Sequence, residues 1–164
     1  MEQGHAKHGQ MDGKMARKSY VMLGISSVVM LVIMYLVMFT MIYSLGEFIQ
    51  NINFLYMAVM MATPMTVVMP LMMPSMYPDR TLNLIVYAGC TLLFVLAFAG
   101  IRMQGLVGDS QFLRSMIPHH SGAILMCEKA KISDPEIRTL CVNIMRSQAK
   151  EIDQMKAIRV RLSS

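Results

Sequence analysis

The sequence contains no tryptophan, and only 7% of its residues are aromatic. Proteins that bind single-stranded nucleic acid use aromatic side chains as stacking platforms beside basic residues. No nucleic-acid-binding motif accompanies the net charge of +5. We therefore interpret the basic balance as a sign of contact with a membrane surface, and we expect no nucleic-acid partner.

Charged residues and histidine are absent from three long apolar stretches, residues 21–43, 54–73 and 82–101. A helix needs about 20 apolar residues to cross the hydrocarbon core of a bilayer. The sequence therefore predicts a three-span membrane domain over residues 21–101. The first stretch is too long, and too far from the start, for a cleaved signal peptide. Without ionisable groups in the spans, we do not expect a proton-coupled carrier or pump.

The orientation of these spans follows from the basic residues near their ends, which favour the cytoplasm. One side has five such residues and the other has two: Lys7, Lys14, Arg17, Lys18 and Arg80 against Arg102 and Arg114. This distribution predicts a cytoplasmic tail over residues 1–20 and an outward-facing C-terminal region.

Methionine is unusually frequent, with 21 copies, and it is missing from the third span. On the first two spans it recurs at helical spacing, at Met30, Met34, Met38 and Met41 and at Met57, Met61, Met65, Met69 and Met73. We favour flexible packing between these two helices. The alternative is a track of thioethers for a soft ion such as Cu(I) or Ag(I).

The second span also contains Pro64 and Pro70, each of which removes a backbone hydrogen bond and is expected to kink the helix. The N-terminal tail has His5, His8, Met11 and Met15 at spacings that suit a soft metal, although a disordered basic tail fits equally well.

A helical hairpin is predicted over residues 109–162. Asp109 or Ser110 is expected to cap a first helix that ends near Lys131, with a kink at Pro118. The loop "ISDPE" offers two caps for a second helix that ends near Leu162. One is a capping box of Ser133 with Glu136, and the other is Asp134 followed by proline.

Two polar residues, Gln148 and Glu151, interrupt the apolar seam of the second helix and need partners. In an antiparallel hairpin turning near residue 133, His120 is expected to be level with residues 145–148, and Met116 with Glu151. Cys127 is expected opposite Cys141, where the pair would form a disulfide or bind copper as thiols. The predicted region contains Met116, His119, His120, Gln148, Glu151 and Met155.

Imidazole and thioether donors with at most one carboxylate suit copper or silver. A closed zinc site would use more histidines or thiolates. A di-iron centre needs several glutamates in Glu-x-x-His motifs, which the hairpin lacks. Ser121 follows His120 directly, so the two side chains point in different directions on a helix and do not suggest a hydrolytic triad. The other interpretation is that the histidine pair only satisfies the polar seam by hydrogen bonding.

The segments "DSQFLRSMIPHHSGAILMCEKA" and "DPEIRTLCVNIMRSQAKEIDQMKAI" resemble the bacterial family called domain of unknown function 305. The resemblance covers about residues 109–158, and its most specific parts are MIPHH and the later Gln-x-x-Glu-Ile-x-x-Met pattern. It implies a ferritin-like fold in which each repeat is two helices, half of a four-helix bundle. It also implies a link with copper binding and tolerance, and a subgroup with membrane spans.

By this resemblance the metal contacts are Met116, His119, His120, Met126 and Met155, with Gln148 and Glu151 as further ligands or their hydrogen-bond partners. Ser121 stands where glutamine is common in the family, and Leu125 where aspartate is common. These departures leave a softer donor set, which favours copper(I) or silver.

The combined prediction is an all-α protein of three transmembrane helices followed by a two-helix ferritin-like hairpin. We expect a multi-pass protein of the bacterial cytoplasmic (inner) membrane, with its C-terminal domain in the periplasm or outside. A homodimer or higher oligomer would complete the bundle, and copper-handling proteins are the expected partners.

The predicted function is binding of copper(I) or silver in copper homeostasis or tolerance. The alternative is a structural or interaction module without metal. We do not expect an enzyme, and a redox metalloenzyme ranks last because the sequence indicates no substrate pocket.

Overall fold

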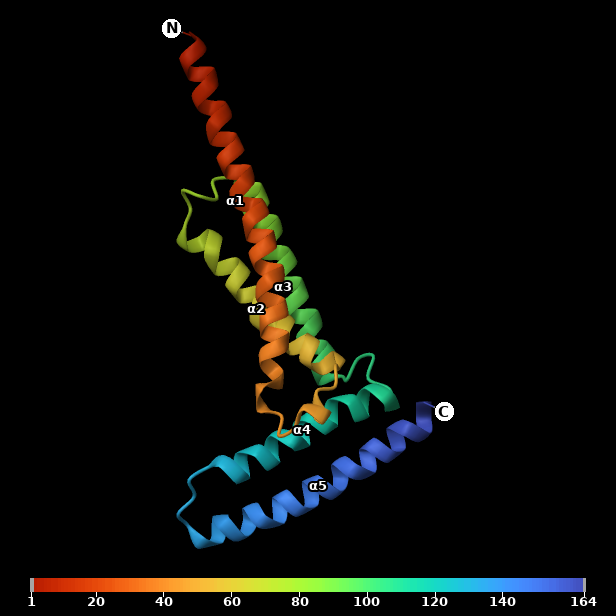
Figure 1. Ribbon diagram of the computed structural model, residues 1–164. Coiled ribbons are helices and arrows are strands. Elements are labelled where there is room, and N and C mark those ends of the chain that lie inside the picture. The colour runs from red at the N-terminus through yellow and green to blue at the C-terminus, as the bar shows by residue number, and fades with distance from the viewer. Residues whose placement is uncertain (1, 164) are drawn as a thin grey trace. The chain divides into compact units, whose positions relative to one another are not determined.

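The computed structural model describes residues 2–163, and side chains for residue 13 and residues 15–163. The described residues form helices joined by loops, with no strand among them (Figure 1), so the predicted all-α class is confirmed: three long apolar helices precede two further helices. The long helices are α1 (Glu2–Val37), α2 (Ile52–Met72), α3 (Arg80–Arg102), α4 (Asp109–Lys129) and α5 (Pro135–Ser163). Two short 3-10 helices, η1 (Met38–Met41) and η2 (Leu45–Glu47), follow α1.

Three helices are long and apolar enough to cross a membrane. They cover Met15–Met41, Ile52–Met72 and Arg80–Arg102, with mean hydropathies of 2.5, 1.7 and 2.4. Their large side chains are mostly exposed, as the 62% exposed Val28 and the 67% exposed Leu84 illustrate. Exposed apolar surface of this extent is what a lipid environment requires of a spanning helix.

The first helix begins at Glu2, well before the predicted start of the span at Val21. Of the tail residues proposed for soft-metal binding, Met15 is described and is 64% exposed. His5, His8 and Met11 lie outside the residues whose side chains the structure describes.

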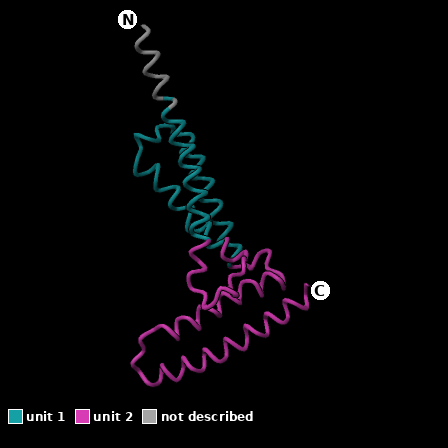
Figure 2. The backbone as a smooth tube through the Cα atoms, viewed as in Figure 1, with its two compact units in different colours: residues 1–35, 56–101 teal, residues 36–55, 102–164 magenta. Residues whose placement is uncertain are grey.

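The chain divides into two compact units, shown in Figure 2. Unit 1 contains Met1–Tyr35 and Tyr56–Ile101, which includes most of the three apolar helices. Unit 2 contains Leu36–Leu55 and Arg102–Ser164, which joins the first interhelical loop to α4 and α5.

Polar and aromatic contacts connect the helices of unit 1. Thr66 on α2 donates a hydrogen bond to Ser27 on α1 at 2.8 Å. Tyr20 on α1 donates to Asn83 on α3 at 2.9 Å. Gly100 on α3 lies against the ring of Tyr56, where an added Cβ would come within 2.8 Å of a ring carbon. A hydrogen bond between side chains is favourable in an apolar environment because each polar group otherwise lacks a partner.

The core of unit 2 lies between α4 and α5, which run side by side in opposite directions (Figure 1). Its buried members are Leu113, Ile117 and Ile124 from α4 and Ile152 and Met155 from α5. The α4 residues recur at helical spacing and so form one apolar face. Ile117, with 0% exposure, is at its centre.

The helix caps differ in part from the predictions. The N-cap of α4 is the extended Gly108, without a side-chain cap, and Asp109 lies in the first turn. A carboxylate in the first turn still favours the helix because it complements the positive end of the helix dipole. At α5, Asp134 accepts a hydrogen bond from the Ile137 N–H at 2.9 Å. Of the two caps offered by the loop, the aspartate followed by proline is the one that forms.

Candidate functional site

His119 and His120 lie in the middle of α4, which continues through Pro118 without interruption. His119 is exposed, whereas the side chain of His120 is only 13% exposed. The two ring centroids are 6.1 Å apart with planes inclined at 70°. One imidazole therefore faces the surroundings while its neighbour faces the hairpin.

His120 faces Glu151 on α5, with 3.1 Å between Nδ1 and Oε2. The other carboxylate oxygen accepts a hydrogen bond from Ser147 at 2.7 Å. Although His120 Nδ1 is buried and close to the carboxylate, it makes no hydrogen bond of acceptable geometry with the described residues. The ring and the carboxylate are close but misaligned, and hydrogen bonds weaken steeply with misalignment. The nitrogen therefore keeps unused capacity to bind another group.

The predicted methionine donors occupy two different environments. Met155 is 8% exposed and belongs to the hairpin core, and Met116 packs against that core. Met126 is 53% exposed and lies outside it. The structure thus brings together Met116 and Met155 through apolar packing and leaves Met126 on the surface.

Gln148 is half-buried on α5. Within the part of the chain that the structure describes, no hydrogen bond joins it to either histidine. Of the two polar residues predicted to need partners, Glu151 lies beside a histidine, His120.

The predicted register of the hairpin is correct at its tip and wrong further along. Cys127 lies opposite Cys141 as expected, but His120 faces Glu151 rather than residues 145–148. Met116, which was expected to be level with Glu151, packs against the core that contains Met155.

Cys127 and Cys141 form a disulfide that joins the end of α4 to the start of α5, with their Cα atoms 5.2 Å apart. Of the two alternatives left open by the sequence, the disulfide is the one observed, and these sulfurs are not free thiols for a metal. Cys90 on α3 is a free, half-buried cysteine.

Glu47 in the first interhelical loop is a buried residue that sequence reasoning did not single out. The residue is 6% exposed, and its side chain accepts hydrogen bonds from the Ser121 hydroxyl at 2.5 Å and the Ser44 N–H at 3.1 Å. The Ser121 oxygen in turn accepts a hydrogen bond from the N–H of Tyr43. The Lys156 ammonium lies 3.4 Å from the same carboxylate. We call Glu47 and these partners, Tyr43, Ser44, Ser121 and Lys156, the loop anchor.

The loop anchor gives a structural reason for Ser121, which stands where glutamine is common in the family that the hairpin resembles. Ser121 has 0% exposure, and a longer side chain has no room there. At the adjacent Gly122, an added Cβ would lie 3.3 Å from the carbonyl oxygen of Met41. Two small residues therefore let the loop approach α4 directly after the histidine pair. The sequence signal for this contact is the adjacent small residues Ser121 and Gly122, together with Glu47 as the single acidic residue of the loop.

A second polar group lies near the hairpin tip, where Tyr43 contacts Glu128. The hydrogen bond to that carboxylate raises the pKa of the Tyr43 hydroxyl. The neighbouring Lys129 ammonium, with a smaller contribution from Tyr43, lowers the pKa of Glu128. Because all three groups are exposed to solvent, these interactions position the loop more than they stabilise the fold.

Among the residues that the structure describes, no group of three or more His, Cys, Asp or Glu side chains could hold one metal ion. A closed zinc site and a carboxylate-rich di-iron site both need such a group. The chain instead offers two imidazoles, one carboxylate and nearby thioethers, which is a softer and less complete donor set.

The methionine stripes of the apolar helices meet only in part. Met30 of α1 and Met65 and Met69 of α2 line one small cavity of about 70 Å³ in unit 1. Met65 and Met69 are still 48% and 40% exposed. The other methionines of the second stripe, Met57, Met61 and Met73, are exposed to a similar extent. Both the packing interpretation and the soft-ion interpretation remain compatible with this arrangement.

Comparison with known proteins places the hairpin in a family. Residues 98–159 match the family described as Domain of unknown function (DUF305). An uncharacterized protein of Acanthamoeba polyphaga mimivirus is 31% identical over 117 residues, which cover 70% of this chain and 75% of that relative. No solved structure matches the chain. The chain belongs to the DUF305 family, and its family region contains the histidine pair, the disulfide and most of α5.

Proposed function

We propose that this protein is a membrane-anchored metal-binding protein whose hairpin binds copper(I) or silver, in copper homeostasis or tolerance. The three apolar helices serve as the anchor, and the hairpin carries the binding site. The proposal assigns binding and not catalytic turnover. It takes His119 and His120 as the principal donors, with Glu151, whose carboxylate lies 3.1 Å from His120 Nδ1, as a further ligand.

The observation that carries this proposal is the state of His120. Its Nδ1 atom is buried, close to a carboxylate, and without a hydrogen bond of acceptable geometry. A buried polar atom without a partner is costly, so an unsatisfied one calls for an explanation such as an ion. The adjacent His119 supplies an exposed imidazole, and Met116 and Met155 supply thioethers in the neighbouring core. Imidazole and thioether together suit copper or silver better than harder ions.

The proposed location is a bacterial cytoplasmic membrane, with the N-terminus in the cytoplasm and the hairpin on the outer side. The excess of Lys and Arg near the tail supports this orientation. The disulfide between Cys127 and Cys141 supports it independently, because disulfides persist in oxidising compartments.

A competition titration with a Cu(I) chelator on the purified full-length chain tests the proposal. We expect about one Cu(I) per hairpin for the wild type, and loss of this binding in the variant His119→Ala with His120→Ala. The matched control replaces the only two other histidines, His5→Ala with His8→Ala. This control should bind as the wild type does.

Two results would contradict the proposal. One is equal Cu(I) binding by the wild type and the His119/His120 variant. The other is absence of bound Cu(I) in a wild-type protein that is shown to be helical and to contain its disulfide. Loss of binding in the tail control alone would move the site to the N-terminal tail.

The second candidate is a structural or interaction module without metal, and the packing of the hairpin favours it. Met155 belongs to the core, Met126 is on the surface, and Glu151 already accepts a hydrogen bond from Ser147. This candidate predicts that Cu(I) leaves the thermal midpoint of the protein unchanged. Binding at 100 times its Kd would instead add about 2.7 kcal/mol of stability.

We further propose that two copies associate to complete a four-helix bundle, because a lone hairpin buries little surface. Several apolar side chains of α5 are left outside the core, including Leu140 at 55% exposed and Val142 at 59% exposed. Size-exclusion chromatography with light scattering in detergent would report a dimer if this is correct.

A further inference from the structure

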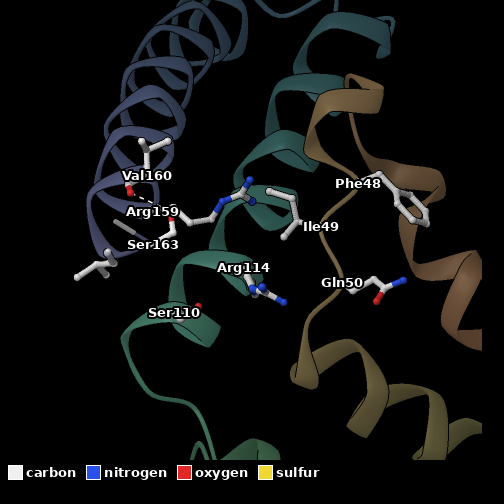
Figure 3. Close-up of a pocket in the computed structure, with 9 residues that line it drawn as sticks. Phe48, Ile49, Gln50, Ser110, Arg114, Arg159, Val160 and Ser163 are labelled. Atoms are coloured by element: carbon white, nitrogen blue, oxygen red, sulfur yellow. Dashed lines mark hydrogen bonds between the residues drawn. The ribbon is translucent and has the colours of Figure 1, made fainter.

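A cavity of about 520 Å³ lies in unit 2, away from the histidine pair, and the metal-binding proposal does not use it. It is lined by the loop before α2, the first turns of α4 and the last turns of α5 (Figure 3). The histidines lie in the middle of α4, so the two sites are separate along the same helix.

Two arginines from different helices lie in this cavity. Figure 3 shows Arg159 extending from α5, and Arg114 from α4, toward the segment that carries Ile49 and Gln50. Within the described residues, no carboxylate forms an ion pair with either guanidinium. Like charges in one cavity repel, so an anion between them would lower the energy of both. A guanidinium also binds phosphate or carboxylate oxygens through two parallel hydrogen bonds.

The remaining lining combines neutral polar groups with apolar ones. Ser110 and Gln50 contribute a hydroxyl and an amide, while Ile49 and Val160 contribute apolar surface. Ser163 already donates its hydroxyl hydrogen to the Val160 carbonyl at 2.8 Å. The cavity therefore suits an anion that is attached to an apolar group better than a fully hydrated ion.

Two of the segments that line this cavity adjoin apolar helices in the sequence. Gln50 is followed closely by α2, which begins at Ile52, and Ser110 follows soon after α3 ends at Arg102. Both α2 and α3 are candidate membrane spans. By connectivity, Gln50 is close to the surface of the membrane, where basic groups bind the head groups of anionic phospholipids.

From this arrangement we infer that the cavity is a binding site for a phosphate group, held by Arg114 and Arg159. The apolar lining and the adjacent span ends favour the head group of an anionic phospholipid as its source. Free phosphate has the same recognition chemistry, and the experiment distinguishes the two.

Native mass spectrometry of the full-length chain in detergent provides the test. Phosphatidylglycerol, phosphatidylcholine or inorganic phosphate is added, and bound molecules are counted. We expect preferential binding of phosphatidylglycerol, reduced at least about tenfold in the variant Arg114→Gln with Arg159→Gln. The charge-matched control, Arg146→Gln with Lys150→Gln, alters two exposed cations of α5 outside the cavity and should bind as the wild type does.

Bound phosphatidylglycerol that inorganic phosphate does not displace identifies a lipid site. Saturable binding of inorganic phosphate, lost in the same arginine variant, identifies a site for soluble phosphate. Equal binding by the wild type and the arginine variant would overturn the inference, as would equal loss in both double variants. If the glutamine pair does not fold, Arg114→Lys with Arg159→Lys keeps both charges and should weaken binding severalfold by removing the paired hydrogen bonds.

Discussion

Replacing Ser121 with alanine should release the first interhelical loop from α4. The Ser121 hydroxyl donates to the buried Glu47 carboxylate and accepts from the N–H of Tyr43. Alanine is slightly smaller than serine, so the change removes both hydrogen bonds without forcing a larger group into a site of 0% exposure. The loop then has to keep a carboxylate buried with fewer donors.

The cost follows from the type of hydrogen bond that is lost. A hydrogen bond to a charged group contributes about 1.5–3 kcal/mol, and more is lost when the charged partner stays buried. Glu47 retains the Ser44 N–H and the more distant Lys156 ammonium. We therefore expect local opening of the loop to become easier by about 2 kcal/mol, which is roughly a 30-fold increase in the open population.

Amide hydrogen exchange measured by mass spectrometry on the full-length protein reports this opening directly. Peptides that cover Met41–Phe48 should exchange roughly 30-fold faster in the Ser121→Ala variant, because exchange depends on the open population. Peptides from the middle of α3, which has no residue in the loop anchor, should be unchanged.

Thr139→Ala provides a matched control, since it removes an exposed hydroxyl that donates only to the carbonyl of Pro135 within α5. The control should leave exchange in the loop unaffected. Unchanged exchange in the Ser121→Ala loop, or equal acceleration in both variants, would refute the role assigned to the anchor.

Three further predictions concern the same unit. Gly122→Leu should also accelerate amide hydrogen exchange in the loop and lower the free energy of unfolding by about 1–3 kcal/mol. Even a Cβ at this position would lie 3.3 Å from the Met41 carbonyl oxygen. Wild-type exchange rates in the loop would contradict this prediction. Replacing both Cys127 and Cys141 with serine should lower the unfolding free energy by about 3 kcal/mol, because the disulfide closes a loop with a sequence separation of 14. A denaturant titration measures this change, and reduction of the wild-type disulfide should have the same effect. Asp134→Ala should cost about 1 kcal/mol through loss of the cap on α5, with Asp134→Asn as a nearly neutral control.

The sequence predicts the helices well because each has a strong local signal. Three uncharged apolar stretches predict three long apolar helices. The observed ends of α2 and α3, Met72 and Arg102, differ by one residue from the predicted ends, whereas α1 ends at Val37, before the predicted end at residue 43. The cap at Asp134 is predicted for the same reason, since an aspartate followed by proline is a local pattern. The cap of α4 is missed because Gly108 needs no side chain to begin a helix.

The details of the site are harder to predict because they depend on contacts between distant segments. The facing of Cys127 and Cys141 near the turn is predicted correctly, whereas His120 contacts Glu151 and not residues 145–148, because its long side chain selects its partner on the other helix. The loop anchor could not be found by local spacing, because Glu47 and Ser121 are separated by 74 positions. The metal ligands proposed from the family resemblance stay predictions until binding is measured.

The loop anchor also has a consequence for biosynthesis. A chain is made from its N-terminus, so Glu47 emerges long before Ser121 and Lys156, the side chains that later surround its carboxylate. Until then the carboxylate has the Ser44 N–H of its own loop as a partner but lacks Ser121 and Lys156, so nothing holds the loop against α4. Completion of this loop therefore waits for the last helix of the chain, and a protein truncated before α5 would expose it to proteases.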